Sequence, residues 1–235
     1  MLVVLEDDDR SLSRDAASIV AHAISTHSHV TLGLATGSTP MGLYRELVRL
    51  HREERLDFSR VVTFNLDEYL GLPPEHPHSY HTYMARHLFD HVNVRPEHIH
   101  IPDGSIRDSY DEYCKSYERD IDEAGGIDLQ ILGIGKEGHV GFNEAASGLH
   151  SRTRLKTLAT QTREDNRRFF GPHEEVPACA ITAIHHGSTA RVSAPRHERL
   201  NAPITPGSAN MAMANSAAIS GTRRMAPEPH KNEQP

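Results

Sequence analysis

The sequence has no tryptophan and only two cysteines among its 235 residues. Cys114 and Cys179 lie far apart in the chain, without the spacing of metal ligands. Two thiols so separated do not form the framework of a disulfide-stabilised secreted domain. We therefore expect two unpaired thiols in a protein that works in a reducing compartment.

The sequence also lacks an excess of positive charge and any long apolar run. Its formal net charge of -7 argues against nucleic acid as a partner. No stretch approaches the length of a membrane span. The apolar start, MLVVLEDDDR, is too short for a signal peptide and is followed by acids. The expectation is a soluble cytoplasmic protein with no membrane partner.

What the sequence does contain is an alternation of short apolar runs with segments whose apolar residues recur at helical spacing. The apolar runs predict strands at 1–5, 30–35, 60–64, 99–102, 127–134 and 155–158. The other segments predict helices at 9–23, after Pro40, and at 80–89, 109–123 and 162–170. Such alternation predicts a parallel sheet covered on both faces. The expected fold class is α/β, a Rossmann-like three-layer sandwich with a mostly parallel central sheet, binding ligands beyond the carboxyl ends of its strands.

The composition changes after about Thr182. Residues 184–235 are rich in Ala, Ser, Pro, Arg and His, and their large apolar residues are isolated. A segment of this kind does not bury enough apolar surface to offset the entropy lost on ordering. The sequence therefore predicts one α/β domain at 1–183, incomplete at its C-terminal end, and a disordered or non-homologous tail at 184–235.

Two motifs follow predicted strands in the first third of the chain. Thr36-Gly37-Ser38-Thr39-Pro40 joins a strand to a helix, where Gly37 permits unusual backbone angles and free amides can bind phosphate. Taken alone, an ordinary capped turn explains it at least as well. In Asn65-Leu66-Asp67-Glu68-Tyr69 a carboxylate can act as a general base. Adjacent acids point in different directions, and a helix cap or solvated acidic turn is the simpler interpretation.

Two further motifs lie between residues 133 and 170. The glycine-rich segment 133–144 places His139 between Glu137 and Glu144, and a carboxylate can orient an imidazole for proton transfer. A structural histidine and a metal site are the alternatives; the spacing does not match HExxH, which disfavours metal. Basic residues at 151–157, 162–163 and 167–170 can hold a phosphate, although a solvated basic face is the usual explanation.

Together the four motifs resemble the glucosamine-6-phosphate deaminase family over roughly residues 30–182. The matching stretches, in family order, are LATGSTPMGLY, VVTFNLDEYLGLPPEHPHSYHTYM, GIGKEGHVGFNE and SRTRLKTLATQTREDNRRFF. The related 6-phosphogluconolactonases share the fold but lack the combination of FNLDEY with GHVGFNE. The resemblance implies that glucosamine 6-phosphate and water are converted to fructose 6-phosphate and ammonia without a cofactor or metal.

The resemblance also implies roles for individual residues. Asp67 would move a proton from C2 to C1 of the sugar, His139 would assist ring opening, and Glu137 and Glu144 would orient His139. The substrate phosphate would be bound by Gly37, Ser38, Thr39 and Arg168. In allosteric members, residues matching Ser147, Arg154 and Lys156 contact an activator, N-acetylglucosamine 6-phosphate, between subunits. Family members occur as monomers and hexamers, so a homo-oligomer is left open.

Two departures from the family keep other interpretations open. Glu137 stands where members typically have Asp or Asn. After VPACAIT the resemblance stops, and a lysine that contacts the phosphate in the family has no convincing counterpart among His185, Arg191 and Arg196. An inactive or destabilised remnant of the enzyme and a regulatory module that binds sugar phosphates are therefore the alternatives.

Overall fold

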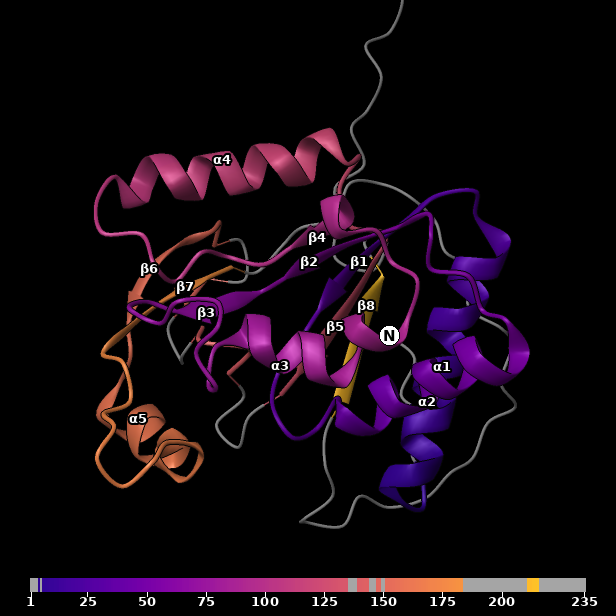
Figure 1. Ribbon diagram of the computed structural model, residues 1–235, viewed down its shortest axis with the longest axis horizontal. Coiled ribbons are helices and arrows are strands. Elements are labelled where there is room, and N and C mark those ends of the chain that lie inside the picture. Colours follow the sequence, from indigo (N-terminus) through magenta and orange to yellow (C-terminus); the bar gives the residue numbers. More distant parts are fainter. Residues whose placement is uncertain are drawn as a thin grey trace, which may run out of the picture.

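The computed structural model describes residues 4, 6–134, 139–143, 147–148, 151–183 and 211–215. A five-stranded sheet with the order β4-β2-β1-β5-β8 forms its centre (Figure 1). The first four of these strands are parallel, and β8 is antiparallel to β5. Their bounds are Ile99–His100 for β4, Val61–Asn65 for β2, Val30–Leu34 for β1, Leu129–Gly133 for β5 and Met211–Asn215 for β8.

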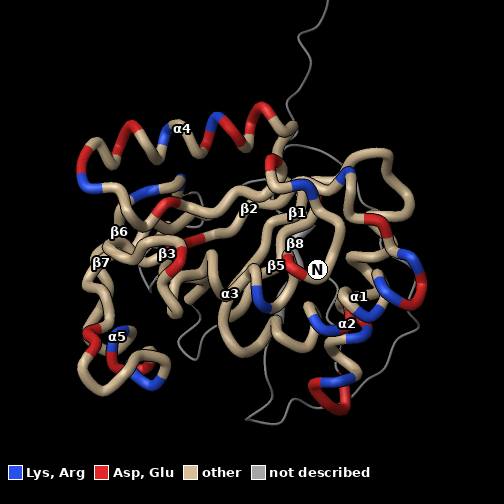
Figure 2. Tube along the Cα trace, viewed as in Figure 1, with Lys and Arg blue, Asp and Glu red and all other residues tan. Residues whose placement is uncertain are grey.

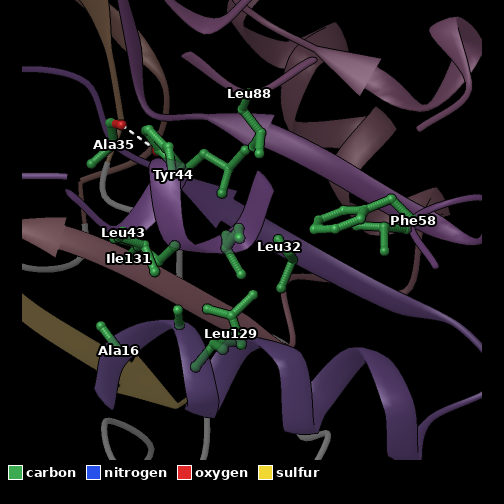
Figure 3. Close-up of a cluster of buried hydrophobic side chains, with 14 of the residues drawn as sticks. Ala16, Leu32, Ala35, Leu43, Tyr44, Phe58, Leu88, Leu129 and Ile131 are labelled. Carbon is green, nitrogen blue, oxygen red and sulfur yellow. Dashed lines mark hydrogen bonds between the residues drawn. The ribbon is translucent and has the colours of Figure 1, made fainter. Parts of the chain in front are cut away.

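Helices cover both faces of this sheet, which makes three layers. Helices α1 (Asp9–Thr26), α2 (Met41–Glu54) and α3 (Tyr80–His87) share one apolar cluster with β1 and β5 (Figure 3). Helix α4 (Tyr110–Glu123) packs through Tyr117 and Ile121 against Val62 and Phe64 of β2. Both faces of the sheet thus pack against apolar side chains of helices, as expected for a buried parallel sheet. The predicted fold class is confirmed.

Local sequence signals explain where several helices begin. The carboxylate of Asp8 accepts a hydrogen bond from the Ser11 amide at the start of α1. The Ser79 hydroxyl accepts one from the Thr82 amide at the start of α3. Each side chain satisfies a backbone donor that has no partner within the helix.

A second, antiparallel sheet lies beside the first and was not predicted. Its order is β3-β7-β6, with bounds Asp67–Tyr69, Cys179–Thr182 and Arg154–Thr157. Strand β3 begins a single residue after β2 ends. The segment 61–69, whose sequence predicts one strand and the turn after it, therefore contributes to two sheets. Strands this short carry too little alternation to be distinguished from loops.

The remaining boundaries agree with the sequence patterns to within a few residues. The predicted helix at 162–170 is divided into α5 (Thr160–Asn166) and the 3-10 helix η3 (Arg167–Phe169). Two other 3-10 turns are η1 (Phe89–His91) and η2 (Pro96–His98). Most of the predicted strand at 1–5 lies outside the described residues, as does the predicted tail apart from β8. The division of the chain at 183 stays a prediction.

Charged residues gather on the outer helices, whereas the strands of the five-stranded sheet carry almost none (Figure 2). In the second sheet, strand β3 contains two buried acids, Asp67 and Glu68. Burying two acids side by side is costly unless each is hydrogen bonded.

None of the helices in the described part of the chain is long and apolar enough to cross a membrane.

Candidate active site

A hollow of about 220 Å³ lies at the carboxyl ends of β1, β2 and β5. The chain runs from β1 to β2 and β4 on one side and then crosses to β5 on the other, so the strand order reverses at β1. Open α/β sheets bind ligands at such a reversal. Its lining residues are 35–39, Leu66, Asp67, Tyr80, 132–134, 139–142, Thr162, Asn166, Arg168 and Phe169.

A larger hollow, of about 430 Å³, lies at the opposite edge of the sheet. Its lining includes Val30 and Val61, which begin β1 and β2. The carboxylate of Asp57 in that lining already accepts hydrogen bonds from Ser59 and Asn93. Parallel sheets bind ligands at the carboxyl ends of their strands, and the larger hollow lies at the amino ends. The smaller hollow is therefore the candidate site.

The loop after β1 has the form that its motif predicts. Gly37 has a φ of 105°, a conformation that side chains other than glycine rarely adopt. Pro40 precedes the first residue of α2, with helical backbone angles. Gly37, Ser38 and Thr39 all line the hollow, at the amino end of α2. Free amides at such an end favour a bound anion.

Asp67 is the buried acid of the hollow, with 4% of its surface exposed. Its Oδ2 accepts a hydrogen bond from the Phe142 amide at 3.0 Å. Burial raises the pKa of Asp67 to about 7, and the Phe142 amide opposes this increase. Gly141 makes the contact feasible, because a Cβ there would lie 2.5 Å from the carboxylate. A carboxyl group with this pKa can both take and return a proton near neutral pH.

Glu68 points away from this hollow, as expected for the neighbour of Asp67 on a strand. Its Oε1 accepts from the Tyr69 amide at 2.8 Å. Its Oε2 accepts from the amides of Tyr80 at 2.7 Å and His81 at 3.3 Å, which begin α3. Burial raises the pKa of Glu68 to about 8, against the lowering effect of these three amides. Glu68 therefore ties α3 to the strand that carries Asp67.

His139 lines the same hollow from the glycine-rich segment after β5. The segment is held by Asn143, whose side-chain amide donates to Thr182 Oγ1 at 3.0 Å and to the Ala183 carbonyl at 2.9 Å. The backbone amide of Asn143 also donates to the Val140 carbonyl at 2.9 Å. These contacts connect the histidine segment to β7. The predicted partners Glu137 and Glu144 lie outside the described residues.

Arg168 reaches the hollow from η3. Its guanidinium lies over the Phe169 ring, 4.7 Å from the ring centre, and this cation–π contact leaves its N–H groups available to an anion. The structure thus brings Asp67, His139 and Arg168 together with residues 37–39 around one hollow.

Ser147, Arg154 and Lys156 do not line this hollow. Arg154 Nη2 donates to Ser147 Oγ at 3.2 Å, and burial lowers the pKa of Arg154. Lys156 follows two residues later on β6. Side chains alternate between the faces of a strand, so Lys156 lies on the same face as Arg154. Their role at a second site stays a prediction.

Sequence reasoning assigned no role to two aromatic residues of the site. Tyr80 lines the hollow and stacks on Phe142, with ring centres 5.9 Å apart. Phe142 also contacts Tyr69 at 4.9 Å. Both lie within stretches that match the family, but aromatic residues at helical or strand spacing usually indicate core positions.

Within the described residues, no group of three or more His, Cys, Asp or Glu could hold a metal ion.

Comparison with known proteins gives a consistent result. The family described as glucosamine-6-phosphate isomerases/6-phosphogluconolactonase matches residues 7–168. The chain is 48% identical over 182 residues to a glucosamine-6-phosphate deaminase of Thermoanaerobacter sp. (strain X514), covering 77% of this chain and 72% of that protein. It is 50% identical over 182 residues to that of Halothermothrix orenii, with 77% and 75% covered.

Solved structures agree with these relatives. A monomeric glucosamine-6-phosphate deaminase superposes with a TM-score of 0.75 at 44% identity, covering 78% of this chain and 76% of that one. A 6-phosphogluconolactonase from Thermotoga maritima has a TM-score of 0.57 at 19% identity, covering 77% and 75%. The second similarity shows the shared fold alone.

Proposed function

We propose that this chain, which belongs to the glucosamine-6-phosphate isomerase/6-phosphogluconolactonase family, converts glucosamine 6-phosphate and water to fructose 6-phosphate and ammonia. The support comes from the relatives, which are glucosamine-6-phosphate deaminases. It comes equally from the single hollow that Asp67, His139, Arg168 and residues 37–39 line.

The reaction needs a proton transfer between adjacent carbons. His139 moves a proton to the ring oxygen as the ring opens to the aldehyde, which makes the C2 proton acidic. Asp67 takes that proton, O1 takes a proton from the ammonium group on C2, and a neutral enolamine forms between C1 and C2. Asp67 then returns its proton to C1, which leaves an iminium at C2. Water adds to C2 and ammonia leaves.

Each step has a physical basis in the hollow. The pKa of Asp67, about 7, suits a group that must accept and then donate a proton near neutral pH. Residues 37–39 and Arg168 would hold the phosphate, which fixes C1 and C2 relative to Asp67. Glu137 and Glu144 would orient His139, a role assigned from their place in the motif.

The test is release of ammonia and formation of fructose 6-phosphate by the full chain. Asp67→Asn should lower kcat/KM by about 10²–10⁴-fold, the range for a general base. Asp122→Asn, an exposed acid of α4, is the matched control and should leave kcat/KM unchanged. Glucosamine without phosphate should be a much poorer substrate. A cooperatively folded chain that releases no ammonia would contradict the proposal.

Two observations favour a second function. The chain covers 72–76% of the relatives and the solved deaminase. The phosphate-binding lysine that the resemblance implies has no convincing counterpart in the sequence after Thr182. A protein that binds sugar phosphate without turnover would fit this departure. Binding of glucosamine 6-phosphate by calorimetry, without ammonia release, would support this function over the first.

Location and assembly are part of the proposal. We infer a cytoplasmic protein, because Cys114 and Cys179 are both free. Cell fractionation checks this expectation. Whether Ser147, Arg154 and Lys156 bind an activator between subunits is tested by sedimentation with and without N-acetylglucosamine 6-phosphate.

A further inference from the structure

Two tyrosine hydroxyls hold the backbone of the loop that follows β1. Tyr44 of α2 donates to the Ala35 carbonyl at 2.5 Å (Figure 3). Tyr83 of α3 donates to the Gly37 carbonyl at 2.5 Å. Two hydrogen bonds, one from each of two helices, thus restrain the backbone of a single loop.

A third tyrosine lies near the same loop. Tyr80, also on α3, lines the hollow together with Thr36. Burial raises the pKa of Tyr83 and of Tyr80, so both hydroxyls keep their protons at neutral pH. Tyr80 lines the hollow whereas Tyr83 does not, so Tyr83 acts on the hollow only through the loop.

The bond from Tyr83 determines the direction of one peptide group. In a trans peptide the carbonyl of one residue and the amide of the next point in opposite directions. Because the Gly37 carbonyl points to Tyr83, the Ser38 amide points away from Tyr83. Ser38 lines the hollow. If this peptide turned over, the carbonyl oxygen would take the place of an N–H donor and would repel an anion.

We propose that Tyr83 is a positioning residue of the phosphate subsite, and that its hydroxyl holds the Gly37–Ser38 peptide with the amide directed to the bound anion. This inference rests on the proposed function, because it takes residues 37–39 as the phosphate-binding loop. The positive φ of Gly37 is consistent with it, since a glycine peptide has few restraints of its own. The restraint is supplied by the tyrosine.

The test removes only the hydroxyl. Tyr83→Phe keeps the ring, which packs on the main apolar cluster and lies 4.5 Å from His87. We expect the dissociation constant for inorganic phosphate, measured on the full chain by calorimetry, to increase about three- to tenfold, the range for one net hydrogen bond. KM for glucosamine 6-phosphate should rise by the same factor while kcat is unchanged, because the phosphate is bound equally before and during reaction.

Tyr113→Phe is the matched control. The Tyr113 hydroxyl also bonds to backbone, accepting from the Asp103 amide at 2.6 Å, but lies outside the hollow. It should lower the melting temperature without changing phosphate affinity. A Tyr83→Phe chain with wild-type affinity for phosphate and wild-type KM would overturn the inference, whatever its melting temperature.

The two proposals fail in different ways. A wild-type chain that binds phosphate but releases no ammonia contradicts the deaminase activity, and the phosphate arm still tests Tyr83. An active wild-type chain whose phosphate affinity and KM survive Tyr83→Phe contradicts only the role of Tyr83. A wild-type chain that binds no phosphate at millimolar concentration contradicts the subsite and therefore the inference.

Discussion

Asp67 combines two properties that usually exclude each other, because it is buried and yet must ionise to act as a base. Burial raises its pKa to about 7 from an ordinary 3.8. The single amide of Phe142 offsets only part of the cost of removing the charge from water. Ionising Asp67 in the folded chain therefore lowers the free energy of unfolding, and this effect can be measured as a dependence of stability on pH.

The folded chain holds a proton on Asp67 between about pH 4 and 7, where the unfolded chain has released it. The free energy of unfolding should therefore fall as the pH rises through this window. Asp67→Asn removes the contribution of Asp67 and leaves that of Glu68, whose pKa is also raised. At pH 8 the free energy of unfolding of Asp67→Asn should therefore exceed that of wild type by up to about 4 kcal/mol, whereas at pH 4 the two should be equal. Calorimetric melting across this range is the measurement.

Catalysis should follow the opposite pH dependence. The base works when deprotonated, so kcat/KM should rise with pH to a plateau above about 7. A wild-type melting curve that does not change between pH 4 and 8, together with activity independent of pH, would show that Asp67 has an ordinary pKa.

Among the elements, α3 has the most direct connection to the site. Glu68 accepts hydrogen bonds from the first two amides of this helix, which the Ser79 cap leaves without a partner. The same helix then provides Tyr80 to the hollow and Tyr83 to the loop. A displacement of α3 would therefore disturb Asp67 and the phosphate subsite together.

Glu68→Gln tests this connection. Gln has one oxygen in place of two, so its NH2 group faces either the Tyr69 amide or the two amides of α3. At least one of the three accepted bonds must therefore be lost. At pH 6 the raised pKa keeps Glu68 neutral, so Glu68 and Gln differ only in the lost acceptor. The expected loss in the free energy of unfolding at this pH is about 1–3 kcal/mol, the cost of an unsatisfied buried group. Denaturant unfolding measures it, and Glu97→Gln, an exposed acid of η2, is the control. Equal stability of both variants would show that Glu68 does not anchor the helix.

In the whole molecule, β5 depends on a segment far away in the chain. Strand β8 pairs with all five residues of β5, from Leu129↔Asn215 to Gly133↔Met211. Strand β5 leads directly to the histidine segment of the hollow. An unpaired edge at this position would expose backbone donors and acceptors and would favour association with other chains.

Two shortened chains distinguish the contributions of the C-terminal region. A chain that ends at Asn215 retains β8 and should melt near the wild-type temperature. A chain that ends at Ala183 lacks β8 and should melt lower and form aggregates that light scattering detects. If both shortened chains behave alike, the pairing of β8 with β5 does not stabilise the protein.

Much of this could be predicted from local patterns. Buried strands at 30–34 and 61–65 are apolar runs, and α1 and α4 repeat at helical spacing, so the covered parallel sheet follows from the sequence. The loop at 36–40 and the acid at Asp67 were recognised for the same reason, since each directly follows a strand. Their common location could be expected because parallel strands end at one edge.

Other features depend on contacts between residues far apart in the chain. The raised pKa of Asp67, the approach of Gly141 to its carboxylate and the bond from Tyr83 to Gly37 require that separate segments meet. Neither burial nor hydrogen-bond direction is a property of a short run of residues. The sequence alone therefore determined the sheet, the helices and which side chains could react. Only the tertiary structure decided how strongly Asp67 holds its proton and which groups orient the loop beside it, because both depend on what surrounds each group in space.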